Sequence, residues 1–254
     1  MSLTEGSRVM VTVQSETTSS IWVVPQNDAS RARRITSGKY DGSGGLAWTP
    51  DGRIVYEAKN ASGTSDLWTI DPNSGHLPKR LTENAGVNRW PTVSPDGRFI
   101  VFESNRSGAF NIWRIDQDGS NPKQMTQSRN SVRPDCTPDG KWVVYQSLDS
   151  GKLALWKVLI DGGIPLKLTD RTSITPVASP DGKLIAYLYA NDQTALPSHL
   201  AVMPLEAQSP EKVFDVSPIF DFGFPIRWTP DGRALAYIHT RNGVSNIWSY
   251  PLAG

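Results

Sequence analysis

The chain has 254 residues, with 26 basic and 25 acidic side chains and a formal net charge of +1. This balance excludes a protein that binds nucleic acid through a surplus of Lys and Arg, and no apolar run reaches the length of about 18 residues that spans a bilayer. The single cysteine, Cys136, excludes an intrachain disulfide framework. We expect a soluble domain with no nucleic-acid partner and no membrane insertion, and the composition leaves a cytoplasmic or periplasmic location open.

Five copies of one turn motif punctuate the chain. Ser or Thr is followed by Pro-Asp-Gly and then by Arg or Lys, and the copies recur at intervals of between 40 and 50 residues. Proline presets φ for the second turn position, Asp tolerates the third, and Gly accepts the positive φ that follows. The motif therefore predicts five hairpin turns. The turn residues are Asp51 and Gly52, Asp96 and Gly97, Asp139 and Gly140, Asp181 and Gly182, and Asp231 and Gly232.

Apolar strands are predicted on both sides of each turn. After a polar loop follows a third strand that holds Trp in most copies, and a short fourth strand ends in an apolar residue and Thr. The Trp positions are 22, 68, 113, 156 and 248, and the segment Ser20-Ile-Trp-Val-Val lies before the first turn as a sixth copy of the third strand. Nearly continuous hydrophobicity in the second strand predicts that both faces of the sheet are covered. We expect the Trp side chains to pack between neighbouring sheets.

A four-stranded antiparallel unit with a period of 40 to 50 residues is typical of a β-propeller blade. Six copies of the third strand predict a single all-β domain over residues 1–254, a six-bladed β-propeller of four-stranded antiparallel blades. The expected blades are 1–38, 39–84, 85–128, 129–171, 172–216 and 217–254, of which the first and last are incomplete. An incomplete last blade leaves an open strand edge, so we expect residues 246–250 to pair with another strand or to form a dimer.

The amino-acid sequence of the repeat resembles that of a known family. The segment from Ser94 through Thr126, with Ser94-Pro-Asp-Gly-Arg98 and then Ser-Asn-Arg-Ser-Gly-Ala-Phe-Asn-Ile-Trp113, resembles the TolB-type, Trp-Asp-like propeller repeat. It also resembles the propeller that lies C-terminal to bacterial Ser/Thr kinase or winged-helix regulatory domains. This resemblance implies the sensor or interaction part of a larger bacterial signalling protein.

Binding residues are expected where loops surround the mouth of the central channel. In a propeller, the loops that precede the first strand of each blade share a face with the loops between the second and third strands, and such convergence makes a default binding site. Arg89 and Arg133 come from adjacent blades and are placed to clamp a carboxylate or phosphate. The alternative is that they are solvated or pair with Asp41 and Asp221. The candidates are Tyr40, Asp41, Arg89, Trp90, Arg133, Thr175, Asp221 and Phe222.

We expect no functional catalytic or metal-binding motif in this chain. Asp221-Phe-Gly223 matches the metal-binding tripeptide of kinases, but the other kinase motifs are missing from the sequence. His76, His199 and His239 lie in different repeats without ligand spacing. We expect no catalytic residue, no metal and no cofactor.

The leading hypothesis is a non-catalytic propeller that recognises a protein, a peptide or a small ligand at the channel mouth. Two alternatives stay open at this point. One is a propeller hydrolase, lactonase or peptidase-associated domain, and the other is a TolB-like envelope scaffold protein.

Overall fold

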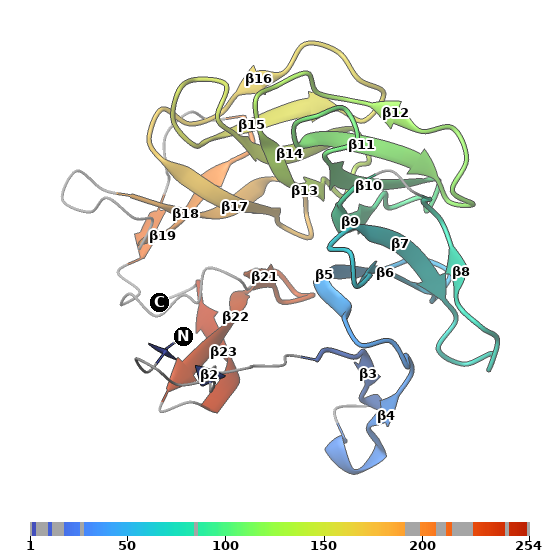
Figure 1. Cartoon of the computed structure of the whole chain (residues 1–254). Coiled ribbons are helices and arrows are strands. Elements are labelled where there is room, and N and C mark those ends of the chain that lie inside the picture. Colours follow the sequence, from blue (N-terminus) through green and yellow to red (C-terminus); the bar gives the residue numbers. More distant parts are fainter. Residues whose placement is uncertain are drawn as a thin grey trace.

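The computed structural model describes residues 2–3, 10–11, 18–25, 28–83, 86–190, 199–206, 212–214, 226–241 and 244–252. Antiparallel sheets are arranged one after another around a common axis (Figure 1), in the order of the sequence. The predicted β-propeller fold is therefore confirmed.

Four blades have four strands each. The first blade consists of β5 (Asp41–Trp48), β6 (Ile54–Lys59), β7 (Ser65–Ile70) and β8 (Lys79–Arg80), and the second of β9 (Asn88–Val93), β10 (Phe99–Ser104), β11 (Asn111–Asp116) and β12 (Lys123–Gln124). The third consists of β13 (Ser131–Cys136), β14 (Trp142–Ser147), β15 (Ala154–Leu159) and β16 (Leu166–Lys167), and the fourth of β17 (Ser173–Ala178), β18 (Leu184–Tyr189), β19 (His199–Pro204) and β20 (Lys212–Phe214). In each, consecutive strands are neighbours.

The fifth blade has three strands among the described residues: β21 (Arg227–Trp228), β22 (Ala234–Arg241) and β23 (Val244–Pro251). In this part of the chain β23 pairs with β22 alone. Pairing of a further strand with residues 246–250 stays a prediction.

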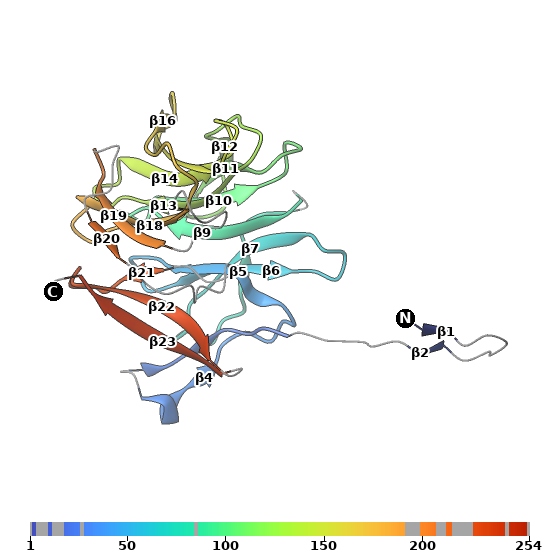
Figure 2. The ribbon, with the colours of Figure 1, turned by 90° about the vertical axis from the view of Figure 1, so that its left-hand side faces the viewer.

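The predicted number of six blades is wrong, because the described residues form five. In place of a blade, residues 1–38 contribute two separate two-stranded sheets, β1 (Ser2–Leu3) with β2 (Met10–Val11) and β3 (Trp22–Val23) with β4 (Arg33–Arg34), and a short 3-10 helix, Ala29–Arg31. Figure 2 shows β1 and β2 away from the stacked blades. The physical reason lies in the missing Pro-Asp-Gly turn: Ser20-Ile-Trp-Val-Val has the sequence of a third strand, but no hairpin of inner strands is specified before it.

The Pro-Asp-Gly turns share one geometry. In every copy the glycine N–H donates to the carbonyl of the Ser or Thr three residues earlier, at 2.8–3.0 Å, and the glycine has a φ between +69° and +83°. The Asp carboxylate of the second blade accepts hydrogen bonds from the Ser94 hydroxyl (2.6 Å) and the Arg98 N–H (3.0 Å). The turns of successive blades are also neighbours. In each turn after the first, the glycine lies close to the proline of the preceding turn, as Gly97 lies close to Pro50.

The hydrophobic core is divided among the blade-to-blade contacts. Along β10, Ile100 and Phe102 belong to a cluster with the first blade, while Val101 between them belongs to a cluster with the third. This alternation follows from the two-residue period of a strand, and it confirms the expected burial of both faces. Trp113 and Trp156 pack against these clusters while partly exposed, whereas the side chains of Trp22 and Trp248 are 57% and 46% exposed.

Within each of the first three blades, a threonine hydroxyl joins the third strand to the chain just after the fourth strand. Thr82 and Thr126 accept hydrogen bonds from the N–H groups of Leu67 and Ile112, both at 2.9 Å, and Thr36 and Thr169 make equivalent contacts. These threonines follow the short fourth strand, so their hydroxyls pair backbone N–H groups that the ladder leaves without a strand partner.

Candidate ligand site at the channel mouth

The first strand of each middle blade contains a bulge at the same place. Register shifts interrupt the pairing of β9 with β10, β13 with β14 and β17 with β18. At each shift a non-glycine residue that precedes a proline has a left-handed φ: Trp90 (+54°), Arg133 (+58°) and Thr175 (+51°). Such a φ is uncommon outside glycine, and for a β-branched residue such as Thr175 it is an outlier. Strain of this kind clusters at functional sites.

Side chains of the preceding blade stabilise two of these bulges. The Glu103 Oε2 atom accepts a hydrogen bond from the Arg133 N–H at 2.7 Å, and the Gln146 Oε1 atom accepts one from the Thr175 N–H at 2.8 Å. Glu103 and Gln146 occupy the same place in their strands, directly after a buried aromatic residue. The preceding blade thus supplies the acceptor that the interrupted ladder cannot supply.

Two of the bulges, at Trp90 and Arg133, border a cavity of about 660 Å³. Its lining comes from the first three blades and includes Arg89, Trp90, Glu103, Phe110 and Arg133. Ligand sites are typically concave and apolar, with a few polar groups that orient the ligand. Aromatic rings and guanidinium groups provide this combination here.

Arg133 is held over an aromatic ring. The central carbon of its guanidinium lies 3.4 Å from the centre of the Trp90 ring, and the Nη1 atom is buried with no hydrogen-bond partner among the described residues. Burial lowers the pKa of the Arg133 guanidinium to about 10, so the group is still cationic at neutral pH. A buried cationic nitrogen without an acceptor is costly, and an anionic ligand would remove that cost.

Arg89 stands beside Arg133 but has a counter-ion. Its Nε atom donates to the Glu103 Oε1 atom at 2.5 Å, and its guanidinium lies 4.5 Å from the centre of the Phe110 ring. The Glu103 side chain is 1% exposed, and burial raises the pKa of this carboxyl above its ordinary value although Arg89 opposes the shift. One carboxylate therefore joins the side chain of Arg89 to the backbone of Arg133.

A second, narrow cavity of about 30 Å³ shares Trp90 and Arg133 with the first. Arg133 and Thr175 line it together with Asp135 and Arg227. The Asp135 carboxylate accepts hydrogen bonds from the Ala178 N–H at 2.9 Å and from the Thr92 hydroxyl at 3.4 Å. Burial raises the pKa of Asp135, and the Arg227 charge opposes that shift.

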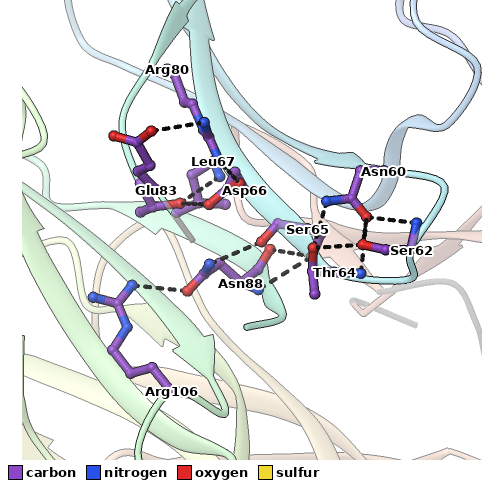
Figure 3. A network of polar contacts seen from close by, with 11 residues as sticks. Asn60, Ser62, Thr64, Ser65, Asp66, Leu67, Arg80, Glu83, Asn88 and Arg106 are labelled. Carbon is purple, nitrogen blue, oxygen red and sulfur yellow. Dashed lines mark hydrogen bonds and ion pairs between the residues drawn. The ribbon is translucent and has the colours of Figure 1, made fainter. Parts of the chain in front are cut away.

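A polar network at the start of β9 lies directly before Arg89 in the chain. Figure 3 shows this network. The Asn88 side chain donates to the Ser65 carbonyl at 2.9 Å, the Ser65 hydroxyl donates to the Asn88 carbonyl at 3.0 Å, and Arg106 donates to the Asn88 side-chain oxygen at 2.9 Å. Asn88 and Ser65 are buried. Because these bonds hold β9 against the preceding blade, they fix the place where Arg89 leaves the strand.

The structure brings together some of the residues predicted from the sequence. Arg89, Trp90 and Arg133 share the larger cavity, and Thr175 joins Trp90 and Arg133 at the narrow one. Asp41 lies elsewhere, in a groove of about 880 Å³ beside β4, where its carboxylate accepts a hydrogen bond from the Gly38 N–H at 2.8 Å.

Three further predicted residues take no part in this cluster. Tyr40 pairs with Ser19 in an isolated bridge and lines neither cavity. Asp221 and Phe222 lie outside the described residues. The acidic partner that Arg89 finds is Glu103, not Asp41.

Sequence reasoning missed the carboxylates of the site. Glu57 and Glu103 each end an otherwise apolar stretch of a second strand, and Gln146 follows them in the next repeat. A polar residue at that place in a buried strand needs a hydrogen-bond partner. An alignment of the repeats would therefore have identified all three as candidate site residues. Asp135 and Arg227 fall just before the Pro-Asp-Gly turns and carried no comparable signal.

The described residues provide neither a metal-binding cluster nor a membrane-spanning helix. No group of three or more His, Cys, Asp or Glu side chains there is arranged to hold a metal ion. In the same part of the chain there is no helix whose length and apolar character would let it cross a bilayer.

Comparison with protein families identifies the chain. The model of the TolB beta propeller domain matches residues 4–172, about two thirds of the sequence. The chain belongs to the TolB beta propeller domain family. The comparison of this TolB-type chain with curated proteins gives no match.

Solved structures agree with the propeller fold. TolB from Acinetobacter baumannii aligns with a TM-score of 0.74 and 21% identity over 88% of this chain and 55% of its own, so the TolB-type chain spans little more than half of that protein. A putative TolB from Agrobacterium tumefaciens aligns with a TM-score of 0.67 and 21% identity, over 87% of this chain and 80% of its own. A chain of a nidogen–laminin complex aligns with a TM-score of 0.71 and 13% identity, over 94% and 88%. At these identities the likeness concerns the fold.

Proposed function

We propose that this TolB-type propeller is a non-catalytic binding domain that recognises a protein or peptide partner at the channel mouth. The observation that carries the proposal is the cavity of about 660 Å³ whose wall includes the strained residues Trp90 and Arg133. Backbone strain persists only where the surrounding structure enforces it, and at Arg133 the Glu103 side chain does so.

The composition of the wall also favours a protein partner. Trp, Phe and Arg side chains dominate the energetics of protein interfaces, and Trp90, Phe110 and the two arginines meet in this one cavity. The Arg133–Trp90 and Arg89–Phe110 stacks hold these groups in place before binding, which reduces the entropy lost on association.

Site-specific photocrosslinking in the source cells tests this proposal. A photoreactive phenylalanine is placed at Lys59 or Asn130, which line the cavity, and as a control at Ser120, an exposed residue of the loop between β11 and β12. We expect protein adducts from the two cavity positions and none from Ser120. Adducts from Ser120 alone would contradict recognition at the channel mouth.

The wider setting of the domain rests on resemblance. A role as a TolB-like envelope scaffold is consistent with the family, and no observation favours the predicted signalling protein or the hydrolase alternative. The signalling and envelope settings share the non-catalytic binding domain that we propose, the hydrolase setting does not, and all three stay predictions.

A further inference from the structure

The charges that line the two cavities, which share Trp90 and Arg133, do not balance. Four basic side chains face three acidic ones, a surplus of one positive charge; the residues are Lys59, Arg89, Arg133 and Arg227 against Glu57, Glu103 and Asp135. The acidic side chains are engaged, since Glu57 accepts a hydrogen bond from the Gly44 N–H at 2.8 Å, Glu103 from Arg89, and Asp135 from Ala178.

Arg133 is where the surplus is localised. Glu103 accepts from the backbone N–H of Arg133, while the Arg133 Nη1 atom stays without an acceptor among the described residues. The Trp90 ring beneath the guanidinium fixes its plane. A fixed guanidinium with free N–H groups matches a planar carboxylate through two parallel hydrogen bonds.

We propose that the channel mouth binds one carboxylate group of the partner, held by Arg133 over Trp90 with Arg89 beside it. This inference rests on the proposed function and names the chemical group that is recognised. The carboxylate belongs to an acidic side chain or to the C-terminus of the partner, because both present the same planar anion.

A phosphate monoester fits this site less well. It carries a charge of about −1.5 to −2 at neutral pH, whereas the lining supplies a surplus of one. Glu103 and Asp135 would repel the additional charge from within the same two cavities. A singly charged carboxylate completes the balance without that repulsion.

Binding of small probes to the whole chain tests the inference. The probes are acetyl-glycyl-glycine, its C-terminal amide, acetyl-glutamate amide and inorganic phosphate, followed by NMR signals of the Trp90 indole and the Arg133 side chain. We expect saturable shifts with one or both of the carboxylate probes and none with the amide. The stronger of the two carboxylate probes identifies the source, terminal or side-chain, and equal binding also supports the inference. Phosphate binding tighter than both would overturn it.

Two substitutions change the affinity in opposite directions. Arg133→Met removes the guanidinium and should weaken carboxylate binding by about tenfold or more, the value of a lost charge-assisted hydrogen bond. Glu103→Gln keeps an acceptor for the Arg133 N–H, as Gln146 does for Thr175, but removes the native negative charge, and should strengthen binding. Arg98→Met, a change at an exposed turn of the opposite face, serves as control and should leave the affinity unchanged.

The outcomes separate the inference from the proposed function. If Lys59 and Asn130 give protein adducts while carboxylate binding is absent or insensitive to Arg133→Met and Glu103→Gln, the carboxylate assignment is wrong and partner recognition at the mouth stands. If the carboxylate binds but those positions give no adducts, the proposed partner recognition is wrong.

Discussion

Removing the Thr126 hydroxyl should lower the free energy of unfolding by more than the loss of packing at that position explains. Thr126 is 2% exposed, its Oγ1 atom accepts a hydrogen bond from the buried Ile112 N–H at 2.9 Å, and it donates to the Asn111 side-chain oxygen at 3.0 Å. Asn111 keeps a second donor, the Ser128 N–H at 2.8 Å, so the group left without a partner is the Ile112 N–H. An unsatisfied buried donor costs about 1–3 kcal/mol.

Two substitutions separate the hydroxyl from the methyl group. Thr126→Ser removes one methyl and should lower the free energy of unfolding by about 0.8 kcal/mol. Thr126→Ala removes the hydroxyl as well and should lower it by about 2–4 kcal/mol in total. The difference between the Ser and Ala variants therefore measures the hydroxyl alone.

Urea unfolding of the wild type and both variants provides the measurement. Far-UV circular dichroism and tryptophan fluorescence are followed together, because coincident transitions justify a two-state free energy. A difference below about 0.5 kcal/mol between the Ser and Ala variants would refute the reasoning, since it would mean that the Ile112 N–H does not depend on Thr126.

Two further predictions concern the turn of the second blade. Gly97 has a φ of +72° and faces Pro50, so Gly97→Val should lower the free energy of unfolding by more than about 1–2 kcal/mol, and Gly97→Asn by less because Asn tolerates this φ; equal losses in urea unfolding would contradict the argument. A hydrogen bond from the Ser94 hydroxyl holds the pKa of Asp96 at about 2, below the ordinary 3.8. Its stabilising contribution is present above 3.8 and lost as the pH falls through 2, so Asp96→Asn should reduce the loss of stability measured between pH 4 and 2, and an unchanged loss would exclude this role.

Local chemistry explains what the sequence predicts well. Proline, Asp and Gly restrict the backbone within a few residues, so the turns and the strands beside them follow without knowledge of the neighbours. The number of blades is different, because it depends on whether a strand finds an inner hairpin to pair with. Trp22 lies in a segment with the right local pattern, but the turn that would precede it is missing, and β3 pairs with β4 alone.

The candidate site also combines features that the sequence predicts with features that it does not predict. Loop position predicts that Arg89 and Arg133 approach each other, and both line one cavity. The left-handed φ of Arg133 is not predictable from its own surroundings, because a residue before proline favours an extended backbone. A contact between blades, the hydrogen bond from the Arg133 N–H to Glu103, opposes that preference, and such contacts are visible only once the repeats are aligned in space.

Three of the hydrogen bonds that join successive blades near the bulges run one way along the polypeptide. Glu103 receives the N–H of Arg133, Gln146 that of Thr175, and Asp135 that of Ala178, so each acceptor is encoded before its donor. Since domains emerge from the ribosome N-terminal end first, every such donor meets an acceptor that has already been synthesised. The order of synthesis therefore matches the order in which these acceptors are needed. Earlier inner strands of a nascent propeller can form these hydrogen bonds before its last residues are synthesised.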